Sequence, residues 1–391
     1  MAYVTAAPLP EATAVPTAPP LATLTAAPAT STPKREPQVS TNAIGLWHSR
    51  LNSGQTYPGF LDIAVGAGAP AYRTQSNQLL LALTSQGVST GLGASITDVL
   101  ESKAKWVLYD KNKRLALGAN GEPLLDIRTD AVVTSVVDAI ASASAEYDGV
   151  LINDVGNDLI RVNNTPMFTG TKAFTEQQRR DAVEVLVRAL RVRLRDKIVI
   201  IGGYAWRDGT VYGARPSEAL DVSALVDGVH IEAFARNPIS ATNEFKTETN
   251  WKRDIDMLAE LSKDNRVVMV STSLDAADAG PDLARQWLNF GLASFLLGKS
   301  GAHTYFNFDS GSTAFAADPL LSAPLGAPIE AYVKLDGGLY LRKFERGLVL
   351  VNPTGDAKKT TLEGGYRTLA GNPVDVGVTL SEHTGLILLK Q

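Results

Sequence analysis

Between Asn42 and about Pro324, short apolar runs alternate with longer stretches whose apolar residues recur at helical spacing. This alternation is typical of strands and helices in βαβα succession, which form a parallel sheet covered by helices. The candidate strands are residues 44–47, 60–65, 88–92, 106–109, 149–153, 198–202, 228–231, 267–271 and 302–308. We predict an α/β fold, a (β/α)8 TIM barrel over residues 42–323. Because such a barrel has eight strands, one of the early candidates must be wrong.

Four of the longer stretches have the apolar spacing of amphipathic helices, at residues 130–145, 175–194, 251–262 and 282–297. The run Thr175-Glu176-Gln177-Gln178 has the form of a capping box, which predicts a helix start there. Gly298 follows the last stretch, and we expect it to cap the end of that helix.

After residue 323 the pattern changes to short alternating segments at residues 338–344, 347–351, 360–362 and 385–389. Turn residues such as Asn352-Pro353 separate them, which predicts a small antiparallel, sandwich-like β domain over residues 324–391. Few of its residues could do chemistry. We expect this domain to stabilise the barrel or to frame one side of a cleft.

Residues 1–41 consist mainly of Ala, Thr and Pro and cannot bury enough apolar surface to fold. Such a linker commonly joins an export signal or a lipid anchor to a domain that works outside the cell. We therefore expect an extracellular or cell-envelope protein that the linker could tether to a membrane or a cell wall, although no signal segment is recognisable in it. The alternative is a disordered cytoplasmic tail.

The composition excludes several kinds of site. The chain of 391 residues has no cysteine, so disulfides, thiolate nucleophiles and Cys-ligated metals are excluded. Its formal net charge of -4 gives no reason to expect nucleic acid as a partner. The histidines, His48, His230, His303 and His383, lack the spacing of a metal site. We expect neither a metal nor another cofactor.

Two of the candidate strands end next to a carboxylate. Asp154 follows the run 149–153, and Glu232 follows the run 228–231. The C-terminal strand ends of a barrel share one mouth, and paired carboxylates carry out glycoside hydrolysis. We predict Asp154 and Glu232 as the catalytic pair, with Glu232 as proton donor and Asp154 as base or nucleophile, although the reverse assignment is open. His230, two residues before Glu232, points to the same side of a strand, where we expect a hydrogen-bonded interior histidine.

Further residues near strand ends are candidates for binding a sugar, whose ring offers an apolar face and a rim of hydroxyls. They are Trp47, Tyr109, Asp110, Asn153, Tyr204, Trp206, Arg236, Tyr305, Asn307 and Asp309. For each aromatic residue, ordinary core packing explains the position equally well. Asp309 is a third acid, which could replace either member of the catalytic pair.

Several runs together resemble a known family. They are Lys105-Trp106-Val107-Leu108-Tyr109-Asp110, Leu125-Asp126-Ile127, Tyr147-Asp148-Gly149-Val150-Leu151-Ile152-Asn153-Asp154, Val229-His230-Ile231-Glu232-Ala233-Phe234 and Leu350-Val351-Asn352-Pro353-Thr354. In order and spacing they resemble hypothetical glycosyl hydrolase family fifteen, over most of the chain from about Gly45. The resemblance implies a barrel with one acid after strand four and another after strand six, which match Asp154 and Glu232. Related hydrolases often have Asp-Asp where this chain has Asn153-Asp154, so Asn153 is expected to orient by hydrogen bonding.

We therefore predict a glycoside hydrolase that acts on a polysaccharide or an oligosaccharide. One alternative is a noncatalytic carbohydrate-binding or scaffold protein on a degenerate barrel, in which the two carboxyl groups need not converge on an open cleft. Another is a barrel enzyme with a different substrate, such as a deacetylase or a lyase. That enzyme would need a metal cluster or a catalytic Tyr/Lys pair, and the sequence shows neither clearly.

Overall fold

The computed structural model describes most of the chain from Ile44 onward. It covers residues 44–48, 61–72, 78–85, 92–109, 112–116, 122–153, 155, 168–169, 172–173, 176–204, 224–238, 240–263, 266–274, 279–310 and 318–391. The predicted linker and the predicted site residues Asp110, Asp154 and Trp206 lie outside these ranges, as does Thr175 of the expected capping box. All the described residues belong to one compact unit, Lys34–Gln391.

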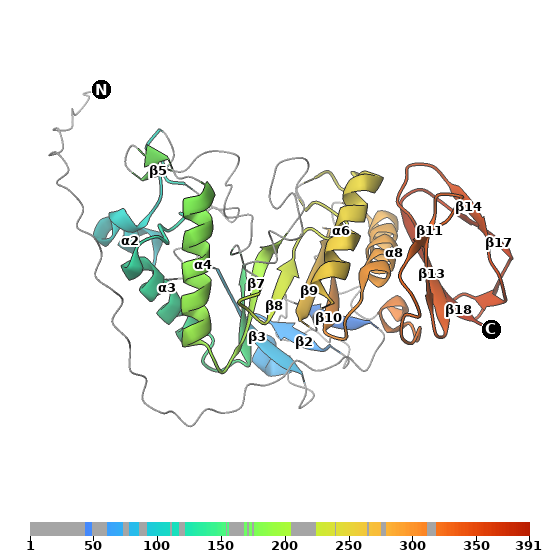
Figure 1. Ribbon diagram of the computed structural model, residues 1–391, viewed down its shortest axis with the longest axis horizontal. Coiled ribbons are helices and arrows are strands. Elements are labelled where there is room, and N and C mark those ends of the chain that lie inside the picture. The colour runs from blue at the N-terminus through green and yellow to red at the C-terminus, as the bar shows by residue number, and fades with distance from the viewer. Residues whose placement is uncertain are drawn as a thin grey trace. The chain divides into compact units, whose positions relative to one another are not determined.

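Eight parallel strands close into a barrel (Figure 1). In order around the barrel they are β1 (Gly45–His48), β2 (Ile63–Val65), β3 (Leu79–Ser85), β4 (Gly149–Asn153), β7 (Ile198–Tyr204), β8 (Gly228–Ile231), β9 (Val267–Ser273) and β10 (Thr304–Asp309). The last strand, β10, pairs in parallel with β1 and closes the barrel. The predicted α/β barrel is confirmed.

The early part of the strand assignment is wrong in two places. The third barrel strand is Leu79–Ser85, which pairs in parallel with β2 and β4. The predicted strand at residues 106–109 is instead a 3-10 turn, η2 (Ala104–Trp106), followed by isolated antiparallel bridges. The predicted strand at 88–92 is described only at Leu92, which lies in a bend. A leucine run without alternation does not distinguish a strand buried on both faces from a helical segment.

Helices cover the outer face of the barrel strands (Figure 1). They are α2 (Ile96–Ser102), α3 (Asp130–Ala143), α4 (Glu176–Arg193), α6 (Glu248–Leu261) and α8 (Pro281–Gly298), with short 3-10 turns η1 (Ala69–Tyr72) and η5 (Pro319–Ser322). The four predicted helices are therefore confirmed to within a few residues at their ends. None of the described helices combines the length and the apolar character that crossing a membrane requires.

Gly298 has a different role from the predicted helix cap. It is the last residue of α8, and Lys299 is the C-cap. A Cβ at Gly298 would lie 3.0 Å from the carbonyl oxygen of Ile255 and 3.0 Å from Cδ2 of Leu258. The glycine therefore allows α8 to pack closely against α6.

The barrel has an apolar interior separate from the layer between strands and helices. The interior is filled by Trp47, Ile63, Val65, Leu79, Leu81, Leu151, Ile198, Ile200, Val267, Met269 and Tyr305. Residues that alternate with them, such as Val150, Ile152 and Val268, belong to the second cluster, which includes the helices. Since alternate side chains of a strand point to opposite faces, this pattern identifies the inward positions of the other strands. In β8, Val229 and Ile231 belong to the second cluster, so Gly228 and His230 take the inward positions.

The C-terminal region forms two antiparallel sheets that share a core. The larger sheet has the strand order β11 (Val333–Lys334), β12 (Tyr340–Phe344), β13 (Gly347–Asn352), β18 (Thr384–Lys390), β15 (Tyr366–Arg367) and β16 (Pro373–Val374). The smaller sheet pairs β14 (Lys358–Thr361) with β17 (Gly377–Leu380), and Leu362 and Leu380 pack with Leu341 and Leu350 of the larger one. Far from this region in sequence, between β4 and α4, β5 (Phe168–Thr169) and β6 (Lys172–Ala173) form another two-stranded sheet. The predicted antiparallel β region is confirmed, and its bounds as a domain stay a prediction.

A buried arginine joins the β region to the barrel. Arg342 on β12 donates through Nη1 to the carbonyl oxygens of Leu296, Leu297 and Lys299 at 2.9, 2.8 and 2.5 Å. Burial lowers the pKa of Arg342 to about 10, so its guanidinium stays charged at neutral pH. The last carbonyls of a helix have no partner within the helix, and here an arginine of the β region supplies one to α8.

Candidate active site at the barrel mouth

A layer of polar side chains lies above the apolar interior, at the C-terminal ends of the barrel strands. By alternation from the interior cluster, its inward positions hold Ser85, Asn153, Gly202, His230, Glu232, Ser271, Asn307 and Asp309. In TIM-barrel enzymes the active site lies at this face.

Glu232 and Asn153 converge over Gly202. A Cβ at Gly202 would lie 2.8 Å from Asn153 Oδ1 and 2.9 Å from Glu232 Oε1. Both oxygen atoms are buried, yet the Glu232 side chain as a whole is 33% exposed. The absence of a side chain at position 202 therefore leaves room for a carboxyl group that has one oxygen buried in the barrel while part of the side chain stays exposed.

His230 lies beneath Glu232 and is almost fully buried. Its Nε2 is 2.9 Å from Ser271 Oγ, and its Nδ1 is 3.8 Å from Glu232 Oε1. Burial lowers the pKa of His230 to about 3, so the imidazole is neutral near neutral pH. The prediction of a hydrogen-bonded interior histidine on the side of Glu232 is confirmed. This residue supports the site without placing a positive charge beneath the carboxyl group.

Trp47 and Tyr305 are part of the barrel interior. They are 2% and 1% exposed, and Trp47 Nε1 donates to the carbonyl oxygen of Val270 at 3.0 Å. The Trp47 ring also meets His230 edge to face, with 4.8 Å between ring centroids. Side chains so deeply buried present no stacking surface to a sugar. We interpret both as the floor of the site. Their positions are therefore explained by core packing, the alternative given above for each aromatic residue.

Arg236 and Tyr109 bind loops of the protein. Arg236 is 4% exposed and donates to the carbonyl oxygens of Ser273 at 2.7 Å and Ser240 at 2.9 Å, which ties the segment after Glu232 to the end of β9. Tyr109 does not follow a barrel strand, and its hydroxyl donates to the carbonyl oxygen of Ala104 at 3.4 Å.

Asn307 and Asp309 follow the alternation of β10 into the mouth. Asn307 is 3% exposed, whereas Asp309 is half-buried and pairs in register with Ser273. Asp309 therefore stays a third acid at this face. Tyr204 ends β7, and only its backbone is described. The roles predicted for it and for Asp110, Asp154 and Trp206 stay predictions.

Two residues of the mouth were not predicted from the sequence as site residues. Gly202 had a signal in the Gly202-Gly203 pair at the end of an apolar run, because glycine in a strand often marks a close approach. Leu83 occupies an inward position of β3 and is 43% exposed. Strand β2 ends at Val65, which pairs with Leu81, so β3 runs past this neighbour and leaves Leu83 uncovered. It offers an apolar surface within the polar layer.

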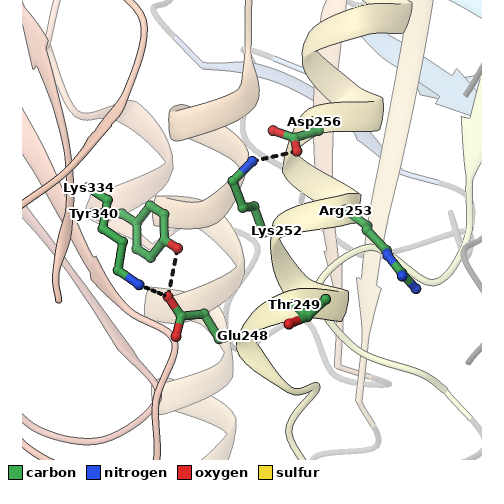
Figure 2. A pocket seen from close by; sticks show the side chains of 7 residues that line it. All are labelled: Glu248, Thr249, Lys252, Arg253, Asp256, Lys334 and Tyr340. Atoms are coloured by element: carbon green, nitrogen blue, oxygen red, sulfur yellow. Dashed lines mark hydrogen bonds and ion pairs between the residues drawn. The ribbon is translucent and has the colours of Figure 1, made fainter.

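A separate pocket of about 370 Å³ lies between α6 and strands β11 and β12 (Figure 2). It is lined by Glu248, Thr249, Lys252, Arg253, Asp256, Lys334 and Tyr340. Figure 2 shows Lys334 and Tyr340 both reaching Glu248, with donor distances of 2.5 and 2.7 Å, and these hydrogen bonds lower the pKa of Glu248. Lys252 is likewise paired with Asp256 at 2.6 Å. The two hydrogen bonds to Glu248 bind α6 to the β region, whereas the pair of Lys252 and Asp256 lies within α6.

The described residues include no group of three or more His, Asp or Glu side chains placed to hold a metal ion. The prediction that the protein needs no metal stays a prediction.

The model of hypothetical glycosyl hydrolase family 15 matches residues 91–348, more than half of the chain. The chain belongs to this family. The match includes Asn153, Gly202 and Glu232, so the converging side chains lie within the region that defines membership. The predicted family is confirmed, and with it the assignment of the chain as a glycosidase.

Solved structures of glycoside hydrolases resemble the chain at low identity. The glycoside hydrolase domain of PelA from Pseudomonas aeruginosa is 12% identical with a TM-score of 0.45, over 71% of this chain and 95% of that one. A pullulanase from Anoxybacillus sp. LM18-11 complexed with maltotriose is 9% identical with a TM-score of 0.49, over 83% of this chain. The chain spans 54% of that pullulanase. These likenesses concern the fold alone, and no curated protein matches the chain.

We predict that Gly202→Ala lowers the hydrolytic rate by about 10-fold to 100-fold, because a displacement of about 1 Å in a reacting group has an effect of that size. The added methyl group would displace the Asn153 amide and the Glu232 carboxyl group. Both are ends of side chains, but the Asn153 Cα would also lie 3.2 Å from the added Cβ, so we expect a moderately lower melting temperature in a variant that still folds. Gly377→Ala is the control, since nothing lies within 4 Å of a Cβ there. Release of reducing ends measures the rate, and a wild-type rate in Gly202→Ala would contradict the convergence over Gly202.

We predict that His230 makes the protein less stable in acid. Its pKa is about 3 in the folded protein and about 6.5 in the unfolded chain, so between these values the unfolded state binds the proton. Stability is therefore lost as the pH falls from about 6.5 toward 3. From pH 7.5 to pH 4.5 the free energy of unfolding should fall by about 2 to 3 kcal/mol more in the wild type than in His230→Gln. Urea unfolding at both pH values measures this, and equal losses would show that His230 is not buried in the neutral form.

Proposed function

We propose that this protein hydrolyses a polysaccharide or an oligosaccharide at the barrel mouth, with Glu232 and Asp154 as the catalytic carboxylates. The observation that carries the proposal is the placement of Glu232. One of its oxygens is buried beside Asn153 over Gly202, while a third of its side chain remains accessible. An acid that is packed into the protein on one side and exposed on the other can meet a glycosidic oxygen in a defined geometry.

Glu232 fits the role of proton donor. A donor must keep its proton until the glycosidic bond breaks, and a neighbouring positive charge would favour loss of that proton. The group beneath Glu232 is the neutral imidazole of His230, and the side chain is removed from water on that face. This uncharged, partly buried environment supports the assignment of Glu232 as the acid.

Asp154 is the proposed base or nucleophile. It follows Asn153 directly at the end of barrel strand β4, two strands around the barrel from β8. Its support is this sequence position together with the family membership of the chain. Asn153 is proposed to orient the pair or a substrate hydroxyl, because its amide oxygen and a carboxyl oxygen of Glu232 converge over Gly202.

The mouth has the mixed character that a sugar requires. Serine, asparagine and carboxylate side chains offer donors and acceptors for a rim of hydroxyls, and Leu83 offers an apolar surface for a ring face. The Ala/Thr/Pro-rich composition of residues 1–41 supports action outside the cell or in its envelope.

We predict that wild-type protein releases reducing ends from at least one member of a panel of starch, pullulan, xylan, β-glucan, galactan and chitosan. Glu232→Gln and Asp154→Asn should each lower that rate by about 10²-fold to 10⁴-fold, the range for loss of general acid–base catalysis. Glu363→Gln, an exposed carboxylate of the β region, is the matched control and should keep the wild-type rate. Melting temperatures of all variants verify that they are folded.

Two results would count against this assignment. Cleavage that survives both substitutions would place the chemistry elsewhere, and a large loss in Asp309→Asn would then identify the third acid as a catalytic group. Binding of a panel glycan without cleavage would favour the noncatalytic carbohydrate-binding protein.

A further inference from the structure

A buried ion pair lies beneath the turn that follows Glu232. Lys246 Nζ donates to Asp254 Oδ2 at 2.6 Å, and the two side chains are 9% and 1% exposed. Lys246 comes from the loop before α6, and Asp254 from the second turn of α6. Two opposite charges have thus been removed from water directly behind the candidate catalytic strand.

Both charged groups also bind the backbone of that turn. Lys246 Nζ donates to the carbonyl oxygen of Ala233 at 2.7 Å, and the Ala235 N–H donates to Asp254 Oδ2 at 2.8 Å. Ala233 and Ala235 are the first and third residues after Glu232. Each is therefore connected to the same carboxylate oxygen, one directly and the other through the ammonium group.

The conformation of this turn needs such support. Ala235 has a φ of 59°, in the left-handed region that residues with a Cβ rarely adopt. A backbone of this kind persists where its surroundings hold it, and such sites cluster at functional positions. Phe234, between the two alanines, is also fixed, because its N–H donates to the Ser271 carbonyl oxygen at 3.1 Å and its carbonyl oxygen accepts from Thr272 Oγ1 at 3.0 Å.

Stability alone does not explain a buried ion pair at this position. The cost of removing two charges from water commonly matches their attraction, so apolar residues of similar volume often stabilise a fold equally well. What apolar residues cannot do is bind the carbonyl oxygen of Ala233 and the N–H of Ala235 at the same time. The pair is therefore suited to fixing a backbone geometry.

We propose that Lys246 and Asp254 are positioning residues for Glu232: through the turn 233–235 they hold its backbone, and thereby its carboxyl group, over Gly202. The inference rests on the proposed function, in which Glu232 donates a proton to the substrate. It predicts that the charges matter for the rate of the chemical step far more than for substrate affinity.

The test compares the Lys246→Met/Asp254→Leu double variant with the wild type. The double variant removes both charges together, so no unpaired charge is left in the interior. The matched control is Glu260→Gln/Lys263→Met, which removes an exposed 2.6 Å ion pair at the end of the same helix. Two readouts are used: amide hydrogen exchange of residues 232–237 without substrate, and kcat and KM on the polysaccharide that the wild type cleaves.

In the double variant we expect exchange of this segment to accelerate at least about 10-fold and kcat to fall about 10-fold to 100-fold, as for loss of outer residues that orient a functional group. KM should stay close to the wild type, whereas the melting temperature should fall by a few degrees, because the Ala233 carbonyl oxygen and the Ala235 N–H lose these partners. The control should match the wild type in both readouts. If the double variant does not fold, the conservative single variants decide. Lys246→Arg should then retain most of kcat, and Asp254→Asn should lose at least about 10-fold.

Unchanged exchange, or faster exchange with unchanged kcat, would overturn the positioning role. A fall in kcat matched by the surface control would do the same. A wild type that cleaves no polysaccharide of the panel would overturn the proposed function and, with it, the catalytic meaning of the ion pair. That failure is distinguishable, because the exchange measurement needs no substrate.

Discussion

The alternation of side chains in a closed parallel barrel is the constraint on which the rest of this structure depends. Once β10 pairs with β1, each strand must direct every second residue into a space of fixed size. Apolar residues fill that space up to the level of Leu151 and Met269, and the next inward positions are polar. Glu232 reaches the mouth because it continues the inward face of β8 after His230.

Packing in the polar layer is as restrictive as in the apolar interior. The carboxyl group of Glu232 and the amide of Asn153 share the space that a Cβ at position 202 would take. Beneath them, His230 is neutral because its burial disfavours the charged imidazole. The result is an acid with a fixed inner face, and the turn that carries it is bound by residues of α6 and the preceding loop.

The sequence predicted the parts of the fold whose signals are local. The runs 149–153 and 228–231 both proved to be barrel strands. The histidine before Glu232 points inward, as predicted from its spacing of two residues. The third strand was missed because a run of leucines has no period. The burial of Trp47 and Tyr305 could not be foreseen, since an aromatic near a strand end has the same pattern whether it faces the floor or the opening of a barrel. Contacts between distant segments, such as Gly298 against α6 and Asp254 beneath Ala235, leave no periodic signal.

The most direct test is a crystal structure of the Glu232→Gln variant with an oligosaccharide derived from the polysaccharide that the wild type cleaves. The account predicts a sugar chain across the C-terminal ends of the barrel strands, with a glycosidic oxygen within hydrogen-bonding distance of the amide at position 232. An oligosaccharide bound only in the pocket beside Glu248 and Lys334, with an empty mouth, would contradict it.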